Sequence, residues 1–229
     1  MKNIPGKSVD MCLADPPYGS TRCSWDVIIE FDPMWKQLKR IVKDNGAICI
    51  FGREPFSSCL RVSNIEMFKY DWIWKKTEPS NHYNAKKMPL RTCESVSVFY
   101  DKQPRYNPQK TTGHKRKVSK RTAEKDNNQI YGANSGPSSY DSTERYPVEV
   151  LEYSRKKQTN KLHPSQKPVE LLEYMLKTYT TERDIVLDFS MGSGSTGVAC
   201  RNLNRGFIGI EEEEKYYKIA KGRIFEDKD

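Results

Sequence analysis

Residues 184–211 restrict the fold of this 229-residue chain more than any other stretch. An apolar strand is predicted over residues 184–189 and carries Asp188 near its end, and a turn rich in serine and glycine leads from it into a helix. A second strand is predicted over residues 206–210 and is followed at once by the acid Glu211. This alternation of strand and helix is typical of doubly wound α/β folds, in which such a turn can hold a nucleoside.

The glycine-rich turn by itself is a weaker indication of a nucleoside site than its position between a strand and a helix. Gly192 and Gly194 would let the backbone approach a ligand, because a Cβ there would collide with it, and Glu211 could accept hydrogen bonds from two ribose hydroxyls. A purely structural turn with a surface acid would read the same way. The spacing of Gly192, Gly194 and Gly197 also fits a dinucleotide fingerprint, so a nucleotide-dependent oxidoreductase stays open at this point.

A second motif follows another apolar strand, predicted over residues 8–14. Two prolines directly after Asp15 cannot continue strand pairing. The Asp15 carboxylate and the Pro16 carbonyl are adjacent acceptors that could hold an aromatic amine with its lone pair toward a methyl donor. Tyr18 offers a ring for stacking a base that has left a duplex, whereas a packed Pro-Pro turn is the structural alternative.

Strand and helix patterns continue along the rest of the chain outside its middle. Trp72 and Trp74 lie two positions apart in a predicted strand, so both should pack on the same side of a sheet. Apolar periodicity and turn signals predict helices over residues 31–43, 54–64 and 169–179 and strands over residues 47–52, 70–75 and 94–100.

The positive charge of the chain is concentrated in its middle. Formal net charge is +9, and residues 101–167 hold 15 Lys and Arg against 7 Asp and Glu. Residues 101–160 also show little periodicity and are too long for an ordinary connection, which predicts an insertion that could contact a polyanion such as nucleic acid. An inert basic loop is the alternative. The expected DNA contacts are Lys115, Arg116, Lys117, Lys120, Arg121, Arg155, Lys156 and Lys157.

Cysteine and histidine spacing argues against a metal site. The six cysteines form no Cys-x-x-Cys pair, and His82, His114 and His163 are dispersed, so we expect reduced thiols and no metal. No stretch approaches 18 apolar residues and the first residues hold no hydrophobic signal core. We therefore expect no membrane association.

Three stretches together carry a family resemblance: residues 13–19, residues 163–172, and residues 186–197 with 207–211. In this order they resemble the β group of amino-directed DNA methyltransferases, where the catalytic motif comes first and the cofactor glycine motif last. The resemblance implies an α/β, Rossmann-like class I methyltransferase, with a mostly parallel seven-stranded-type sheet, helices on both faces and an inserted target-recognition region.

The resemblance also divides the chain into three parts. Residues 1–100 would form the catalytic half of the methyltransferase domain, residues 101–160 the basic target-recognition insertion, and residues 161–229 the cofactor-binding half. The implied catalytic residues are Asp15, Pro16, Pro17 and Tyr18. The implied contacts to S-adenosylmethionine come from Asp188, Phe189, Gly192, Gly194, Ser195, Thr196, Glu211, His163, Lys167 and Asp15.

The implied activity is methyl transfer from S-adenosylmethionine to the exocyclic 6-amino group of adenine in a specific double-stranded DNA sequence, without a covalent enzyme intermediate. An Asp at the head of the catalytic motif is usual in the adenine enzymes of this family. The alternatives are the 4-amino group of cytosine, and a catalytically weak DNA-binding relative that lacks the first strand.

The expected setting follows from the same resemblance. It places the protein in the cytoplasm of a bacterial or phage-infected cell, with a restriction endonuclease as a partner to be tested. Most relatives begin with a strand and helix before the segment that matches residues 1–5. Without them we expect an open adenine side of the cofactor pocket and an exposed sheet edge, which favours a homodimer.

Overall fold

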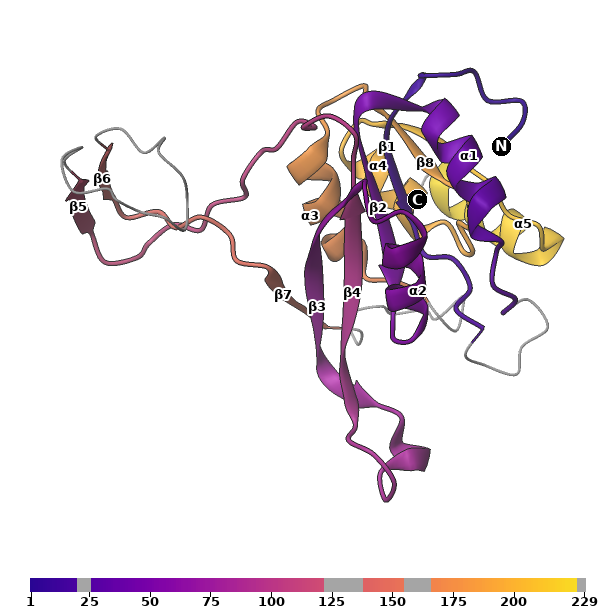
Figure 1. Ribbon diagram of the computed structural model, residues 1–229, viewed down its shortest axis with the longest axis horizontal. Helices are drawn as coiled ribbons and strands as arrows, with labels where there is room; N and C mark the ends of the chain where they lie inside the picture. The colour runs from indigo at the N-terminus through magenta and orange to yellow at the C-terminus, as the bar shows by residue number, and fades with distance from the viewer. Residues whose placement is uncertain (20–25, 122–137, 155–165, 226–229) are drawn as a thin grey trace. The chain divides into compact units, whose positions relative to one another are not determined.

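The computed structural model describes residues 1–19, 26–121, 138–154 and 166–225 and forms two compact units (Figure 1). The first unit comprises residues 1–107 and 149–229, and the second comprises residues 108–148. No helix in the described ranges is long and apolar enough to span a membrane.

A seven-stranded sheet forms the centre of the first unit, in the order β7-β3-β4-β2-β1-β8-β9. Neighbouring strands run parallel at four places, and β4 alone runs against the others because it pairs antiparallel with both β2 and β3. The predicted mostly parallel sheet is confirmed. Its strands are β1 (Val9–Ala14), β2 (Val42–Gly52), β3 (Phe68–Ser80), β4 (Arg91–Phe99), β7 (Val150–Tyr153), β8 (Ile185–Asp188) and β9 (Gly206–Gly209).

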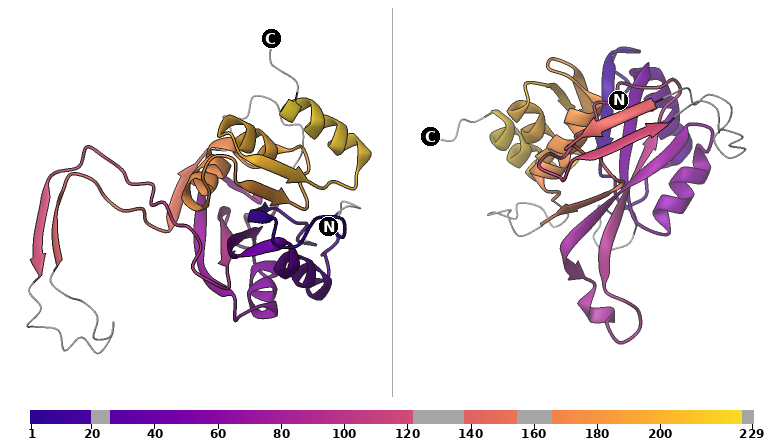
Figure 2. Two further views of the ribbon diagram at one scale, coloured as in Figure 1. Left: turned by 90° about the horizontal axis from the view of Figure 1, so that it is seen from above. Right: turned by 90° about the vertical axis from the view of Figure 1, so that its left-hand side faces the viewer.

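Helices cover both faces of this sheet, as Figure 2 shows. Alternate residues of a strand point to opposite faces, so in β1 Met11 and Leu13 enter one core while Cys12 and Ala14 enter the other. The first core is closed by α3 (Val169–Tyr179) and α4 (Ser195–Asn202), and the second by α1 (Phe31–Ile41) and α2 (Phe56–Ser63). The helix α5 (Glu214–Phe225) packs through Ala220 and Ile224 beside Met191.

The helix patterns of the sequence explain these layers. In α1 the side chains of Met34, Trp35, Leu38 and Ile41 recur at helical spacing and all four are buried. The predicted helix over residues 169–179 has the observed bounds of α3, with Pro168 immediately before its first turn, where a missing N–H costs nothing. The other predicted elements differ from the observed ones only at their ends.

The predicted insertion has other bounds in the structure. Residues 101–107 and 149–154 belong to the first unit, and β7 pairs parallel with β3, with Trp74 opposite Leu151. The second unit contains an antiparallel pair of strands, β5 (Lys117–Arg121) and β6 (Ser138–Ser142), and an isolated bridge between Thr111 and Arg145.

Candidate active site

A cavity of about 780 Å³ opens at the end of the sheet where β1, β8 and β9 finish. Its wall includes residues 15–18 after β1, residues 188–193 from the end of β8 into its following turn, and residues 210–213 after β9. The carboxyl ends of parallel strands in open α/β sheets are where ligands usually bind, and a volume of a few hundred Å³ suits one. The two sequence motifs therefore share one cavity.

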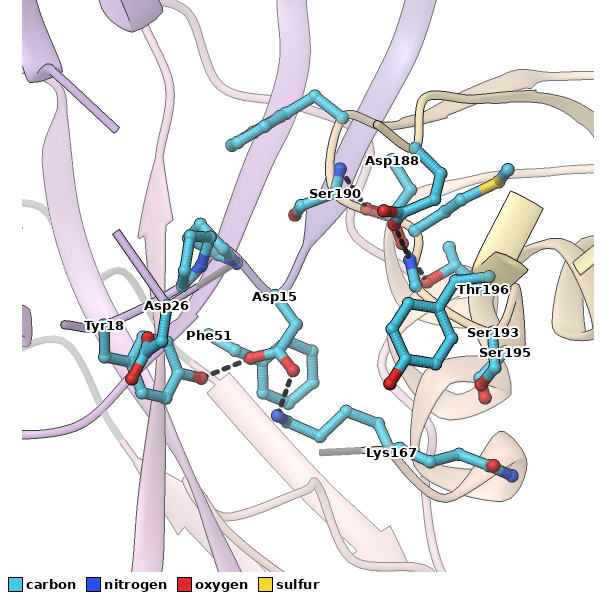
Figure 3. Close-up of a pocket in the computed structure, with 18 of the residues that line it drawn as sticks. Asp15, Tyr18, Asp26, Phe51, Lys167, Asp188, Ser190, Ser193, Ser195 and Thr196 are labelled. Atoms are coloured by element: carbon cyan, nitrogen blue, oxygen red, sulfur yellow. Dashed lines mark hydrogen bonds and ion pairs between the residues drawn. The ribbon is translucent and has the colours of Figure 1, made fainter. Parts of the chain in front are cut away.

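The residues after β1 meet around the Asp15 carboxylate (Figure 3). The Tyr18 hydroxyl donates a hydrogen bond to Asp15 Oδ1, and the Lys167 ammonium contacts Asp15 Oδ2. The Tyr18 ring packs on Phe56, with centroids 5.1 Å apart. Burial, and then the neighbouring Asp15 carboxylate, raise the pKa of Tyr18 well above its usual value. The phenol therefore stays protonated and remains a donor.

Buried side chains of alternating charge extend from Asp15 to strands β3 and β4. Lys167 Nζ also lies 3.5 Å from Glu94 Oε2, and Lys76 pairs with Glu94 Oε1. Burial alone would lower the pKa of Lys167, but the charges of Asp15 and Glu94 outweigh it and raise that pKa. Burial would likewise raise the pKa of Glu94, but Lys167 and Lys76 hold it below its usual value. Lys167 and Glu94 are therefore ionised at neutral pH.

The acid at the end of β8 holds the glycine-rich turn. Asp188 accepts the Ser190 N–H at 3.1 Å and the Thr196 hydroxyl at 2.7 Å. Burial raises the pKa of Asp188 to about 7. The side chain of Asp188 thus ties the start of the turn to the first residues of α4 and remains close to protonation at neutral pH.

The acid after β9 is held from the same turn. Glu211 accepts the Gly192 N–H at 2.8 Å on one carboxylate oxygen and the Glu213 N–H at 3.0 Å on the other. A carboxylate has about four lone-pair sites, so roughly two remain for a ligand. The Ser190 hydroxyl lines the cavity and has no hydrogen-bond partner among the described residues. The cavity therefore offers oriented acceptors and an unused hydroxyl.

The two glycines of the turn have different roles. Gly192 lines the cavity with a φ of 51°. Gly194 does not line it: φ is 77°, and a Cβ at this position would meet the Ala220 Cβ at 2.8 Å. The reason for a glycine at position 194 is therefore the close approach of α5, not the approach of a ligand as the sequence suggested. Phe189, Ser195 and Thr196, which the sequence predicts as cofactor contacts, line the cavity.

None of the predicted DNA-contacting residues that the structure describes lines this cavity. Lys115, Lys117 and Lys120 are exposed in the second unit. Arg116 is exposed as well, but Asp141 accepts two hydrogen bonds from its guanidinium, at 2.7 and 2.5 Å. The backbone of the predicted Arg121 ends β5. The remaining predicted site residues, Arg155, Lys156, Lys157 and His163, lie outside the described residues.

Sequence reasoning missed several residues of the cavity wall. Trp74, Lys76 and Glu94 come from β3 and β4, and Phe51 and Arg53 come from the end of β2. One signal was available: Lys76 continues the inward series of Trp72 and Trp74 at a spacing of two. A charge at an inward position of an apolar strand needs a buried partner, and here that partner is Glu94. Other lining residues that were missed are Asp26, Val27, Ile28, Ile29, Ser80, Leu172 and Tyr216.

The mostly parallel seven-stranded sheet with helices on both faces matches the class I methyltransferase fold. Among solved structures, the chain matches the PvuII DNA methyltransferase, described as cytosine-N4-specific, with a TM-score of 0.70 over 99% of this chain and 82% of that one. At 15% sequence identity this match concerns the fold alone. The M1.HpyAVI–SAM complex matches with a TM-score of 0.64 and 26% identity, over 98% of this chain and 91% of that one.

Sequence comparison identifies the family. The family model described as DNA methylase, N6_N4_Mtase, matches residues 9–222, and the chain belongs to this family. It is 27% identical to the type II methyltransferase M.HinfI of Haemophilus influenzae and 29% identical to the type II methyltransferase M.HpaI of Haemophilus parainfluenzae. The alignments cover 100% and 98% of this chain, which spans 66% and 70% of those relatives.

Proposed function

We propose that this protein transfers the methyl group of S-adenosylmethionine to the exocyclic 6-amino group of adenine in a specific DNA sequence. The observation that carries the proposal is the single cavity shared by the Asp15 motif and the Asp188–Glu211 turn region. One side of the cavity presents acceptors for an amine, and the other presents groups suited to a nucleoside linked to an amino acid. A donor and an acceptor of a methyl group would meet between them.

The cofactor side fits S-adenosylmethionine by its donor set. The remaining lone pairs of Glu211 suit the two ribose hydroxyls, and the Ser190 hydroxyl suits the polar methionine end. Phe189, which lines the cavity, supplies an apolar wall. When bound, the cofactor supplies an electrophilic methyl group on a sulfonium.

The catalytic work of this chain is to hold the amine. Its lone pair is delocalised into the aromatic ring, so the amine must be oriented before it attacks. Hydrogen bonds from the amine to the Asp15 carboxylate and the Pro16 carbonyl favour a tetrahedral nitrogen whose lone pair faces the methyl donor. Tyr18 presents its ring to a base extruded from the duplex. The oriented nitrogen would form the new bond to the methyl carbon as the carbon–sulfur bond breaks, the sulfur would leave as a neutral thioether, and the methylated nitrogen would release one proton to water.

Adenine is favoured over cytosine by the Asp at the head of the motif, through the family resemblance. Products should therefore be examined as nucleosides, since N6-methyladenine and N4-methylcytosine are separated by chromatography and mass spectrometry. Purified chain, DNA and isotopically labelled cofactor should give labelled N6-methyladenine. Labelled N4-methylcytosine alone would replace the adenine proposal with the cytosine one.

Asp15→Ala distinguishes the amine-holding side of the cavity from the side proposed for the cofactor. Methyl transfer should be abolished while the dissociation constant for S-adenosylmethionine, measured by calorimetry, stays close to that of the parent. Because Asp15 is assigned to the target amine, equal loss of transfer and cofactor binding would contradict the assignment. Transfer below detection in the parent itself, with intact cofactor binding, would favour a catalytically weak DNA-binding relative.

The second unit, with its exposed lysines, is proposed as part of the target-recognition region. Its positive charge supports contact with DNA phosphates, which position a protein on the duplex. The type II relatives extend the proposal to a restriction-modification setting, in which an endonuclease cuts the same site when it is unmethylated. A homodimer remains part of the proposal, and light scattering of the purified chain tests it.

A further inference from the structure

Four charged side chains in the wall of the cavity alternate in sign: Asp15, Lys167, Glu94 and Lys76. Their side chains are 19%, 8%, 11% and 2% exposed, respectively. They come from four separate segments of the chain, and together they are neutral. Charges so deeply buried cost several kcal/mol each unless partners compensate them, so each member depends on its neighbours.

Lys167 lies at the centre of this network. Its ammonium contacts Asp15 on one side and lies 3.5 Å from Glu94 on the other. The same nitrogen is 5.1 Å from the centroid of the Phe51 ring and 5.8 Å from that of Tyr18, where the ring faces further stabilise a cation. These contacts direct the ammonium toward the amine-holding side of the cavity, as Figure 3 shows for Lys167 and Asp15.

The two oxygens of Asp15 are held differently. Oδ2 contacts the buried ammonium of Lys167, which is anchored from behind by Glu94. Oδ1 accepts a hydrogen bond from the Tyr18 hydroxyl, which is neutral and can turn to its other orientation in the plane of the ring. An incoming amine can replace the hydroxyl without unpairing a buried charge, whereas replacing the ammonium would unpair two. Oδ1 is therefore the oxygen that the amine can take.

We infer that Lys167 is a positioning residue for the Asp15 carboxylate, with Glu94 as its second anchor, and does not bind the cofactor. The inference rests on the proposed function, because it gives Asp15 the target amine as its ligand. Lys167 fixes Oδ2, so that Oδ1 faces the position of the amine and can exchange the Tyr18 hydroxyl for it. Glu94 prevents the ammonium from following the carboxylate toward the cavity.

Lys167→Met tests the inference because it keeps most of the length of the side chain and removes its charge. At saturating cofactor, kcat for methyl transfer should fall about 10- to 100-fold, the range expected when a catalytic group is misplaced by about 1 Å. The dissociation constant for S-adenosylmethionine should be unchanged. Lys167→Arg restores the charge and should recover part of kcat, which a merely structural loss would not do.

Two further variants test the role of Glu94. Glu94→Gln should also lower kcat without weakening cofactor binding, and the double variant with Lys167→Met should be no slower than Lys167→Met alone, because both act through one carboxylate. If a single variant fails to fold, Lys76→Met combined with Glu94→Gln keeps the network balanced. This pair should still lower kcat.

Lys75→Met is the matched control. Lys75 is the neighbour of Lys76 on β3, is exposed, and pairs with Glu152 at 2.7 Å. Its loss should leave kcat and cofactor binding unchanged.

The outcomes separate the inference from the proposed function. Folded Lys167→Met with parental kcat, or with weakened cofactor binding and parental kcat at saturation, would overturn the inference. A parent chain that transfers no methyl group would instead refute the proposed function. In that case the cofactor titration still decides whether Lys167 is a cofactor residue: weaker binding by Lys167→Met opposes the inference, and unchanged binding supports it.

Discussion

Asp188→Asn should make the protein more stable at neutral pH, although it alters a buried residue in the wall of the cavity. Burial raises the pKa of Asp188 to about 7, whereas a carboxyl in an unfolded chain titrates near 4. Asparagine has the same size, and its amide can accept the Ser190 N–H and donate to the Thr196 hydroxyl. The hydrogen bond from Ser190 is thereby kept, and the one that Thr196 donates to the aspartate is replaced by one in the opposite direction.

The direction of this pH dependence follows because the folded protein favours the protonated form of the Asp188 carboxyl. Below about pH 4 the carboxyl is neutral in both the folded and the unfolded chain, so the pKa difference costs nothing. Between about pH 4 and 7 the Asp188 carboxyl ionises in the unfolded chain but stays protonated in the folded chain. The free energy of unfolding therefore falls as the pH rises through this range. The full difference between a pKa near 4 and one of about 7 corresponds to roughly 4 kcal/mol.

Urea denaturation of parent and variant at several pH values measures this difference. The free energies of unfolding should be similar at pH 4 and diverge as pH rises, with Asp188→Asn more stable by up to roughly 4 kcal/mol at pH 8. Asp44→Asn is the control of opposite sign, because a hydrogen bond from Lys7 lowers the pKa of this exposed carboxyl. A variant of Asp188 that is equal to or less stable than the parent at pH 8 would refute the reasoning.

Two more outcomes test the cofactor and DNA sides. Glu211→Ala should weaken S-adenosylmethionine binding by roughly 1–3 kcal/mol, the cost of unpaired ribose hydroxyls, and an unchanged dissociation constant would remove Glu211 from the site. DNA affinity should fall steeply with salt, and Lys115→Ala should reduce the slope by about 1, whereas Arg116→Ala should reduce it less because Asp141 already neutralises that charge. Equal slopes for the parent and Lys115→Ala would place the DNA path elsewhere.

The sequence predicted those parts of the fold whose signals are local. The helix over residues 169–179 was predicted to the residue, because apolar side chains recur at helical spacing after a proline. Strand β7 was not predicted, since its four residues lie in a charged stretch and owe their conformation to pairing with β3, about 77 positions earlier for Trp74 and Leu151. Pairing over such a separation leaves little local signal.

The candidate site likewise contains residues with a local sequence signal and residues placed only by distant contacts. Residues 15–18 and the acids Asp188 and Glu211 could be predicted to lie near one another because each lies at or just after the end of a recognisable strand. The partners of these residues were not found, and Lys167 was expected at the cofactor although its ammonium contacts Asp15, 152 positions away. No local pattern can specify such a contact, because it depends on which loops the sheet brings to one edge.

The parity of charges within apolar strands is nevertheless a usable signal. Lys76 shares the inward parity of Trp72 and Trp74, and Glu94 shares that of Val96 and Val98. A single buried charge of this kind would destabilise the fold, but two of opposite sign at inward positions of adjacent strands can satisfy each other. Glu94 also lies near the Lys167 ammonium, which in turn contacts the Asp15 carboxylate after β1. Inward charges on neighbouring strands therefore indicate a polar part of the cavity wall in this chain, although the loop residues that complete it lie far away in the sequence.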